Sequence, residues 1–142
     1  MVIDNPNNPP HPYHQTKEKL RKFRLSTSRA KDPQAKIYII DRDTKEVRSD
    51  DTIYSNMEDL ADDLPDSSPR FIILSHPLTL PSGRLSVPYV MLYWLPENCN
   101  PSQRMTYASA VELMRNTAEV NRVIEVSADE DVIDIAKKLA TQ

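Results

Sequence analysis

The sequence of 142 residues predicts an α/β domain in which one mixed sheet of five or six strands lies between two helical layers. Three observations lead to this prediction. Apolar runs of strand length alternate with longer segments of helical period. Proline and asparagine mark many of the boundaries between these segments. A chain of this length, with 39% hydrophobic residues, can also bury a core without disulfides or metals.

The chain is expected to begin with an arm that leads into one domain. Residues 1–12 hold four prolines and three asparagines, a composition typical of a flexible segment. A single domain is then expected over residues 13–142, since neither an internal repeat nor a linker divides them. Its first helix is expected over residues 13–24, with Leu20 and Phe23 as apolar contacts and a basic outer surface.

A strand pair and a short helix are expected next. Residues 35–41 form an apolar β-branched run, residues 41–44 a turn, and residues 46–49 a returning strand. Residues 55–58 have the spacing of a capping box, in which serine and glutamate satisfy free backbone N–H groups. This helix is expected to stop at Pro65. Its inward face is expected to hold Met57, Leu60, Ala61 and Leu64.

Two further strands are expected in the middle of the sheet. Residues 70–75 are almost continuously apolar, which is typical of a strand covered on both faces. Gly83, the only glycine in the chain, lies in a turn at residues 81–84. A long aromatic strand is expected over residues 85–95, with Pro88 near its start, where a missing N–H is tolerated.

A long helix is expected after these strands. Asn100 is expected to cap it, with Pro101 in the first helical position and Gln103 completing a capping box. The helix is expected to run to about Glu119. Its inward face is expected to hold Tyr107, Ala108, Val111, Met114 and Ala118, with Arg104 and Arg115 at the margins.

The last expected elements are a strand and a helix. Residues 121–126 have the pattern of a strand, and residues 127–130 open a helix. The inward residues of this helix are expected to be Val132, Ile133, Ala136 and Leu139. Four helices and five or six strands in mixed order indicate one sheet that is largely covered.

Composition argues against several classes of protein. The net charge of −3 argues against a dedicated nucleic-acid binder. No apolar run reaches the roughly 18 residues that a membrane span needs, and residues 1–14 lack the basic and apolar regions of a secretion signal. Cys99 is the only cysteine, so no intrachain disulfide can form and a reducing compartment is expected.

No residue pattern indicates an enzyme, a cofactor or a metal site. A single glycine is too few for a phosphate-binding loop. His11 and His14 have metal-compatible spacing, but they lie in the proline-rich arm without a second pair of ligands. Cys99 has no neighbouring histidine or second cysteine, which favours a structural role. His76 is expected in an ordinary loop, and the acids of residues 50–66 on a solvated helix.

Charge is unevenly distributed along the chain. Residues 17–31 contain seven basic residues and one acid, whereas residues 50–66 contain seven acids and no lysine or arginine. A solvated helix face explains most such runs. Opposite blocks of charge on one small domain also orient it toward a charged partner and speed their encounter.

The outer stripe of the long helix is the most informative surface. It combines small residues with a flexible methionine, in the series Ser102, Met105 or Thr106, Ser109, Leu113 and Asn116. Small residues allow a partner to approach closely, and methionine adapts its shape to a groove. The alternative is that Met105 and Leu113 tuck under neighbouring loops.

The order of elements and the run from Met105 to Ser109 resemble the actin-depolymerising-factor homology fold, whose central helix carries a similar Met-x-Tyr-Ala-Ser run. Other stretches resemble, within that family, the glia maturation factors. These are residues 18–24, 64–65 with 69–72, 116–119 with 122–125, Gly83 with Arg84, and the start of the long helix at residues 99–103. The similarity spans about residues 16–140.

The resemblance implies a binding protein that is not an enzyme and needs no cofactor or metal. Glia maturation factors bind the actin-related protein 2/3 complex, suppress new branching and release existing daughter filaments, but bind actin itself poorly. A monomer is implied, with the actin-related protein 2 subunit as its contact, and neither nucleic-acid binding nor membrane insertion. The implied location is the cytoplasm at branched cortical actin, with the nucleus as a second location.

The resemblance also implies two surfaces. The positions that match the family's binding face are Lys19, Arg21, Lys22, Arg24, Ser102, Arg104, Met105, Thr106 and Ser109. Gly83 and Arg84 match a second surface, which is implicated in releasing the daughter filament.

Two alternatives stay open at this point. Cofilin-like proteins sever or depolymerise filaments, and they typically carry several basic residues along the long helix. Here only Arg104 and Arg115 remain, and no serine precedes Ser26 for the inhibitory phosphorylation of cofilin. A lipid-surface or scaffold domain would use the basic run at residues 17–31, and its binding would weaken steeply with salt.

The chain also departs from the animal glia maturation factors. Val111 and Leu113 replace residues that are often basic in those proteins. Residues 76–84 are proline-rich and apolar where those proteins have an acidic turn. Because this loop belongs to the second surface, the resemblance implies binding more directly than debranching.

Overall fold

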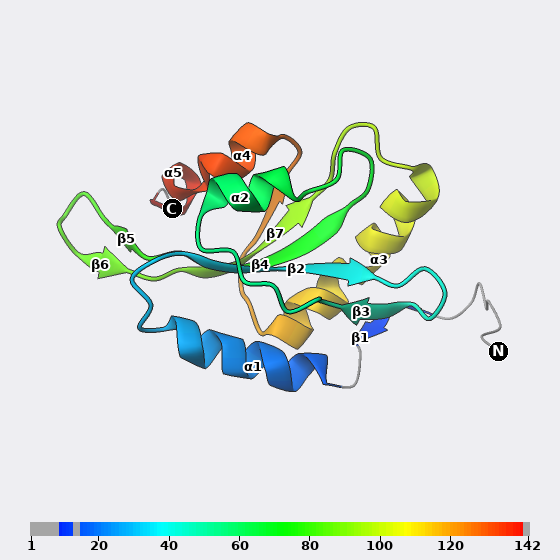
Figure 1. Cartoon of the computed structure of the whole chain (residues 1–142), viewed down its shortest axis with the longest axis horizontal. Helices are drawn as coiled ribbons and strands as arrows, with labels where there is room; N and C mark the ends of the chain where they lie inside the picture. The colour runs from blue at the N-terminus through cyan, green and yellow to red at the C-terminus, as the bar shows by residue number, and fades with distance from the viewer. Residues whose placement is uncertain (1–8, 13–14, 141–142) are drawn as a thin grey trace.

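The computed structural model describes residues 9–12 and 15–140 of the chain. Its strands are β1 (His11–Pro12), β2 (Gln34–Ile40), β3 (Glu46–Arg48), β4 (Arg70–Ser75), β5 (Leu78–Thr79), β6 (Leu85–Ser86), β7 (Tyr89–Trp94) and β8 (Val123–Val126). Its helices are α1 (Thr16–Thr27), α2 (Met57–Asp62), α3 (Pro101–Ala118), α4 (Asp129–Ile133) and α5 (Ile135–Ala140). Six strands form one sheet in the order β1-β3-β2-β4-β7-β8, and β5 pairs with β6 in a separate ribbon. Helices lie on both sides of the large sheet (Figure 1), which confirms the predicted architecture.

The sheet is mixed, and its middle strands are antiparallel. β4 pairs with β2 on one side and with β7 on the other, so that Phe71 lies opposite Tyr93. β8 runs parallel to β7, and β1 runs parallel to β3. Phe71, Ile72, Ile73 and Leu74 of β4 are completely buried, which confirms the strand predicted over residues 70–75. Because helices cover both faces, this strand can be apolar at every interior position.

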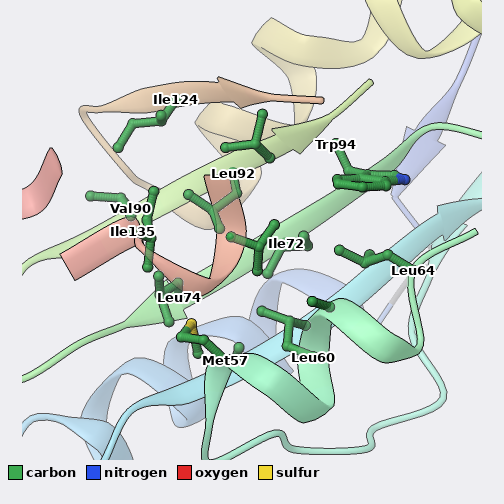
Figure 2. Close-up of a cluster of buried hydrophobic side chains, with 14 of the residues drawn as sticks. Met57, Leu60, Leu64, Ile72, Leu74, Val90, Leu92, Trp94, Ile124 and Ile135 are labelled. Atoms are coloured by element: carbon green, nitrogen blue, oxygen red, sulfur yellow. The ribbon is translucent and has the colours of Figure 1, made fainter. Parts of the chain in front are cut away.

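Alternate residues of β4 feed two hydrophobic clusters. Ile72 and Leu74 pack in the cluster that also holds residues of α2, α4 and α5 (Figure 2). Phe71 and Ile73 point to the opposite face and pack in the cluster that holds residues of α1 and α3. The predicted apolar contacts of the first two helices are all buried, namely Leu20, Phe23, Met57, Leu60, Ala61 and Leu64.

The first described residues form an edge strand. His11–Pro12 pair with β3, and the His11 N–H donates to the carbonyl of Lys45 at 2.9 Å. Residues 1–8 of the expected arm, and residues 13–14 at the start of the expected first helix, lie outside the described residues. The structure therefore places the end of the expected arm against the sheet.

α1 ends three residues later than the helix predicted over residues 13–24. The Ser26 hydroxyl donates to the carbonyl of Phe23 at 2.8 Å. The Thr27 hydroxyl donates to the carbonyl of Arg24 at 3.1 Å. In this last turn, short hydroxyl side chains thus bond to carbonyls of the preceding turn.

The start of α2 corrects the capping box predicted at residues 55–58. Asn56 is the cap, and its side-chain oxygen accepts a hydrogen bond from the Asp59 N–H at 2.8 Å. The cap has moved by one residue because asparagine caps a helix at least as well as serine. α2 ends at Asp62, before the predicted stop at Pro65.

The strand predicted over residues 85–95 is divided in two. β6 pairs with β5 in the ribbon, while β7 joins the large sheet. Pro88 lies between them, lacks an N–H for a strand ladder, and accepts a hydrogen bond on its carbonyl from the His76 N–H at 3.1 Å. The turn predicted around Gly83 is confirmed, and this glycine has a φ of 87°, which side chains disfavour.

The start of α3 confirms the predicted cap and corrects the capping box. The Asn100 side-chain oxygen accepts from the N–H groups of Ser102 at 2.8 Å and Gln103 at 3.2 Å. The reciprocal bond is missing, because Gln103 Oε1 is buried without a hydrogen-bond partner among the described residues. The Asn100 N–H donates to the carbonyl of Ser67 instead, at 3.4 Å.

The inward face predicted for α3 is wrong at Ala108. This residue is exposed, and Ala110 is buried in its place. The Tyr107 hydroxyl accepts a hydrogen bond from the Ile40 N–H at 2.9 Å, which fixes the rotation of the helix about its axis. The other predicted inward residues are buried or pack against the same cluster, namely Tyr107, Val111, Met114 and Ala118.

The terminal helix is interrupted at Asp134, which separates α4 from α5. Val132 and Leu139 are buried as predicted. Ile133 was expected inside but is 39% exposed, whereas Ile135 is completely buried. The break changes the rotation of the residues that follow it, so a single helical period does not describe the segment.

Candidate partner-binding face

The candidate face consists of the outer sides of α1 and α3. These two helices pack against each other and share one hydrophobic cluster on the same side of the sheet. Leu20 and Phe23 anchor α1 in that cluster, and Tyr107 and Met114 anchor α3. The structure therefore places the predicted basic residues and the predicted small-residue stripe on two neighbouring helices on one side of the sheet.

Met105 is strongly exposed within the stripe, with 74% of its surface accessible. Ser102 and Ser109 are exposed on either side of it, and Thr106 and Leu113 are half-buried. The alternative that Met105 tucks under a neighbouring loop is therefore wrong. An exposed methionine among small residues is a surface that a complementary apolar groove can cover.

The hydroxyl groups of the stripe are already bonded within α3. The Thr106 hydroxyl donates to the carbonyl of Ser102 at 3.0 Å, and the Ser109 hydroxyl donates to the carbonyl of Thr106 at 2.7 Å. A partner that covers the stripe thus desolvates few unsatisfied donors. This lowers the cost of burying the stripe in an interface.

Two of the predicted basic residues hold α1 to the end of α3. Arg21 Nε donates to the Glu119 carboxylate at 2.6 Å. Arg24 donates to the Glu119 carbonyl at 3.0 Å and lies over the ring of Tyr89, 4.6 Å from its centroid. The hydrogen bond from Arg21 lowers the pKa of Glu119, and burial raises the pKa of Tyr89 to about 12. Arg21 and Arg24 therefore position α1 as well as offering charge to a partner.

Lys19 connects α1 to the segment after β3 through Asp51. Its ammonium group donates to the Asp51 carboxylate at 3.1 Å, and the buried Lys36 of β2 reaches the same carboxylate at 3.5 Å. The hydrogen bond from Lys19 lowers the pKa of Asp51 despite an opposing desolvation effect. Lys22 pairs with Glu18 one turn away, at 3.5 Å, in an exposed pair of small expected energy.

No pattern in the sequence indicated the roles of Glu119, Asp51 and Tyr89. Glu119 lies 98 residues from Arg21 along the chain, and Asp51 lies 32 residues from Lys19. Spacing rules detect partners one helical turn apart but not partners brought together by the fold. Glu119 has one unusual local feature: it ends α3 in a left-handed backbone conformation with a φ of 58°.

The second predicted surface lies toward the opposite end of the molecule from the start of α3. Gly83 and Arg84 are exposed at the turn of the β5–β6 ribbon. This ribbon projects from one end of the molecule, whereas the β2–β3 turn and the start of α3 lie toward the other end (Figure 1). Leu85 is 77% exposed beside Arg84, so the ribbon presents apolar as well as basic groups.

The residues considered for chemistry were His11, His14, His76, Cys99 and the acids of residues 50–66. No group of three or more histidine, cysteine, aspartate or glutamate side chains could hold a metal ion among residues 9–12 and 15–140. Cys99 is buried, and the His76 ring lies 3.0 Å from the carbonyl of Pro77. Within the same residues, no helix is both long enough and apolar enough to cross a bilayer. His14 lies outside the described residues.

Known proteins share this sequence pattern and fold. The family described as cofilin/tropomyosin-type actin-binding protein matches residues 13–139. Glia maturation factor beta from Homo sapiens is 36% identical over 120 residues, which cover 82% of each chain. The solution structure of glia maturation factor from Caenorhabditis elegans has a TM-score of 0.75 and 26% identity, covering 96% of this chain and 99% of that one. The crystal structure of Streptomyces griseoflavus cofilin has a TM-score of 0.74 at 15% identity, covering 91% and 95%, and shows the shared fold.

Proposed function

Because this chain belongs to the cofilin/tropomyosin-type actin-binding family and, within it, to the glia maturation factors, we propose that it binds the actin-related protein 2/3 complex. In this proposal it inhibits the nucleation of branches and promotes the dissociation of existing ones. The contact is with the actin-related protein 2 subunit, in the cytoplasm at branched cortical actin.

The observation that carries the proposal is the exposure of Met105 on a rigid helix. Met105 is 74% exposed, although its helix is fixed by a buried face and by the bond from the Ile40 N–H to Tyr107. In the proposed complex, Met105 enters an apolar groove of the partner, and Ser109 allows the two backbones to approach. Side chains of this kind at the centre of an interface supply a large share of its binding energy.

The basic residues of α1 have an orienting role in this proposal. Lys19, Arg21, Lys22 and Arg24 are exposed on α1, which packs against α3, and each already has an acidic or aromatic neighbour. A partner with acidic groups opposite α1 competes with exposed ion pairs that are individually weak. These residues therefore contribute more to the rate and direction of encounter than to the final affinity.

Actin itself is the competing partner, because the matching family is described as actin-binding. The small number of basic residues on α3 argues against tight binding to actin. Arg104 and Arg115 are the only basic residues of α3, and Arg115 bonds to the Glu112 carboxylate at 2.7 Å. Arg104 is thus the one α3 cation without an ion pair in the part of the chain that the structure describes.

Binding to the two partners can be compared directly. We expect the purified chain to bind the actin-related protein 2/3 complex at least about tenfold more tightly than monomeric actin, a difference of about 1.4 kcal/mol. Titration of the fluorescently labelled chain with each partner, under one salt condition, measures this ratio. Equal affinities, or tighter binding to actin, would instead favour a cofilin-like protein that severs or depolymerises filaments.

A further inference from the structure

A polar groove of about 380 Å³ lies between the β2–β3 turn and the first two turns of α3. Arg42 and Lys45 line the groove from the turn, and Ser102, Gln103 and Thr106 line it from α3. The Tyr107 hydroxyl bonds to the Ile40 N–H at 2.9 Å and so ties the two walls together. The groove is therefore bounded by two elements that are fixed relative to each other.

The groove is continuous with the α1–α3 face. Ser102 and Thr106 line the groove and also belong to the stripe that surrounds Met105. A partner that covers Met105 and extends toward the start of α3 therefore meets the opening of the groove.

The lining of the groove carries a net positive charge, from Arg42 and Lys45 against the single carboxylate of Asp41. Arg42 and Lys45 form no ion pair among the residues that the structure describes. Asp41 also lines the groove, but its carboxylate accepts the N–H groups of Thr44 at 3.0 Å and Asp43 at 2.9 Å. The start of α3 adds the partial positive charge of a helix N-terminus. The groove thus favours a negatively charged occupant.

Gln103 adds a requirement for a hydrogen-bond donor in the occupant of the groove. Its Oε1 atom is buried and accepts no hydrogen bond from the described residues, although the residue lines the groove. A buried acceptor of this kind gains from a donor in the occupant. A simple anion offers carboxylate or phosphate oxygens but no N–H group. An acidic peptide segment offers both, because its backbone carries N–H donors beside the acidic side chains.

We propose that this groove receives an acidic segment of the protein that binds the α1–α3 face. The carboxylates of the segment contact Arg42 and Lys45, and one of its backbone N–H groups donates to Gln103 Oε1 once that side chain turns into the groove. This inference rests on the proposed function and extends its interface from α3 onto the β2–β3 turn.

Charge reversal tests the groove with a matched control. The Arg42→Glu/Lys45→Glu variant is expected to bind the actin-related protein 2/3 complex about tenfold more weakly than the unmodified chain, because like charges then oppose each other. The control, Lys137→Glu/Lys138→Glu, makes the same change in net charge on exposed residues of α5, which packs on the opposite face of the sheet from α3, and is expected to stay within about twofold. Arg42→Glu alone leaves the left-handed backbone of Lys45 untouched, and it should shift affinity in the same direction. Equal affinity of the groove variants and the control would overturn the proposal.

A second measurement separates this inference from the proposed function. Hexaglutamate is titrated into the ¹⁵N-labelled chain while the amide signals of residues 41–45 and the side-chain amide of Gln103 are followed. We expect these signals to shift in the unmodified chain and to stay fixed in Arg42→Glu/Lys45→Glu, even if the complex itself fails to bind. Signal shifts confined to residues of α1 would overturn the proposal that the groove binds an acidic segment. The proposal would also be overturned if the groove variant lost self-association or binding to anionic vesicles but kept its affinity for the actin-related protein 2/3 complex.

Discussion

Replacing both Met105 and Ser109 with aspartate is expected to weaken binding to the actin-related protein 2/3 complex by about 100-fold. Met105 is 74% exposed and Ser109 lies one turn further along the same side of α3, so both substitutions place charge in the centre of the proposed contact. A buried carboxylate without a partner is costly in any interface. Equilibrium titration of the complex with each protein measures the loss.

The same variant is expected to keep its fold. Neither side chain contributes to the two hydrophobic clusters, so the free energy of unfolding should change by no more than about 0.5 kcal/mol. Ile53→Asp/Ser55→Asp is a matched control, because it replaces an exposed apolar residue and an exposed serine in the segment before α2, outside both predicted surfaces. A sharp fall in thermal stability of the α3 variant would show that the stripe belongs to the core. Equal binding losses in both variants would show that binding is not centred on α3.

Replacing Phe71 with alanine is expected to destabilise the fold by about 3–5 kcal/mol. Phe71 is completely buried in the middle of β4, and its ring lies 5.6 Å from that of Tyr93 and 5.3 Å from that of Tyr107. Its removal leaves a cavity beneath α1 and α3, which the surrounding rigid sheet cannot fill. Because small domains are stable by only about 5–15 kcal/mol, this is a large fraction of the total. Denaturant unfolding monitored by circular dichroism measures it.

The control for this core substitution is Leu25→Ala. Leu25 is 76% exposed on α1, so its truncation should change the free energy of unfolding by less than about 0.5 kcal/mol. A loss below about 1 kcal/mol for Phe71→Ala would contradict the packing described for this cluster. Together with the Met105 and Ser109 variant, this pair distinguishes residues that hold the fold from residues that bind the partner.

The parts of the fold that could be predicted are those determined by neighbouring residues. β4 follows from an apolar run with no interior polar residue, and the cap of α3 follows from Asn100 and Pro101 in adjacent positions. A local pattern can still fail where two neighbouring residues are both able to cap the same helix. Asn56 caps α2 although Ser55 and Glu58 have the spacing of a capping box, because both asparagine and serine are good caps.

The parts that could not be predicted depend on distant contacts. Ala108 was expected inside α3, but the bond between Tyr107 and the Ile40 N–H sets the rotation that buries Ala110 instead. Ile133 was expected inside the terminal helix, but the break at Asp134 moves the buried position to Ile135. In both cases the apolar pattern fits two rotations, and the contacts formed in the tertiary structure select one.

The candidate site likewise combines features set by neighbouring residues with features that depend on distant contacts. Residue types and helical spacing predicted an outer stripe on the long helix but left open whether Met105 tucks under a loop, and the structure shows this side chain 74% exposed. The role of Glu119 was not predicted, because Arg21 and Arg24 reach it from almost 100 residues away. The groove beside Gln103 was missed for the same reason, since it forms only where the β2–β3 turn meets α3. Whether these residues contact a partner remains a prediction.

Imaging of branched actin filaments tests the central proposal most directly. Preformed branches made with the purified actin-related protein 2/3 complex are exposed to the chain, and unbranched filaments in the same field provide the internal control. We expect daughter filaments to detach while unbranched filaments keep their length, because the proposed contact is with the complex and not with the filament side. Fragmentation of unbranched filaments at the same concentration, with branches left attached, would contradict the proposal.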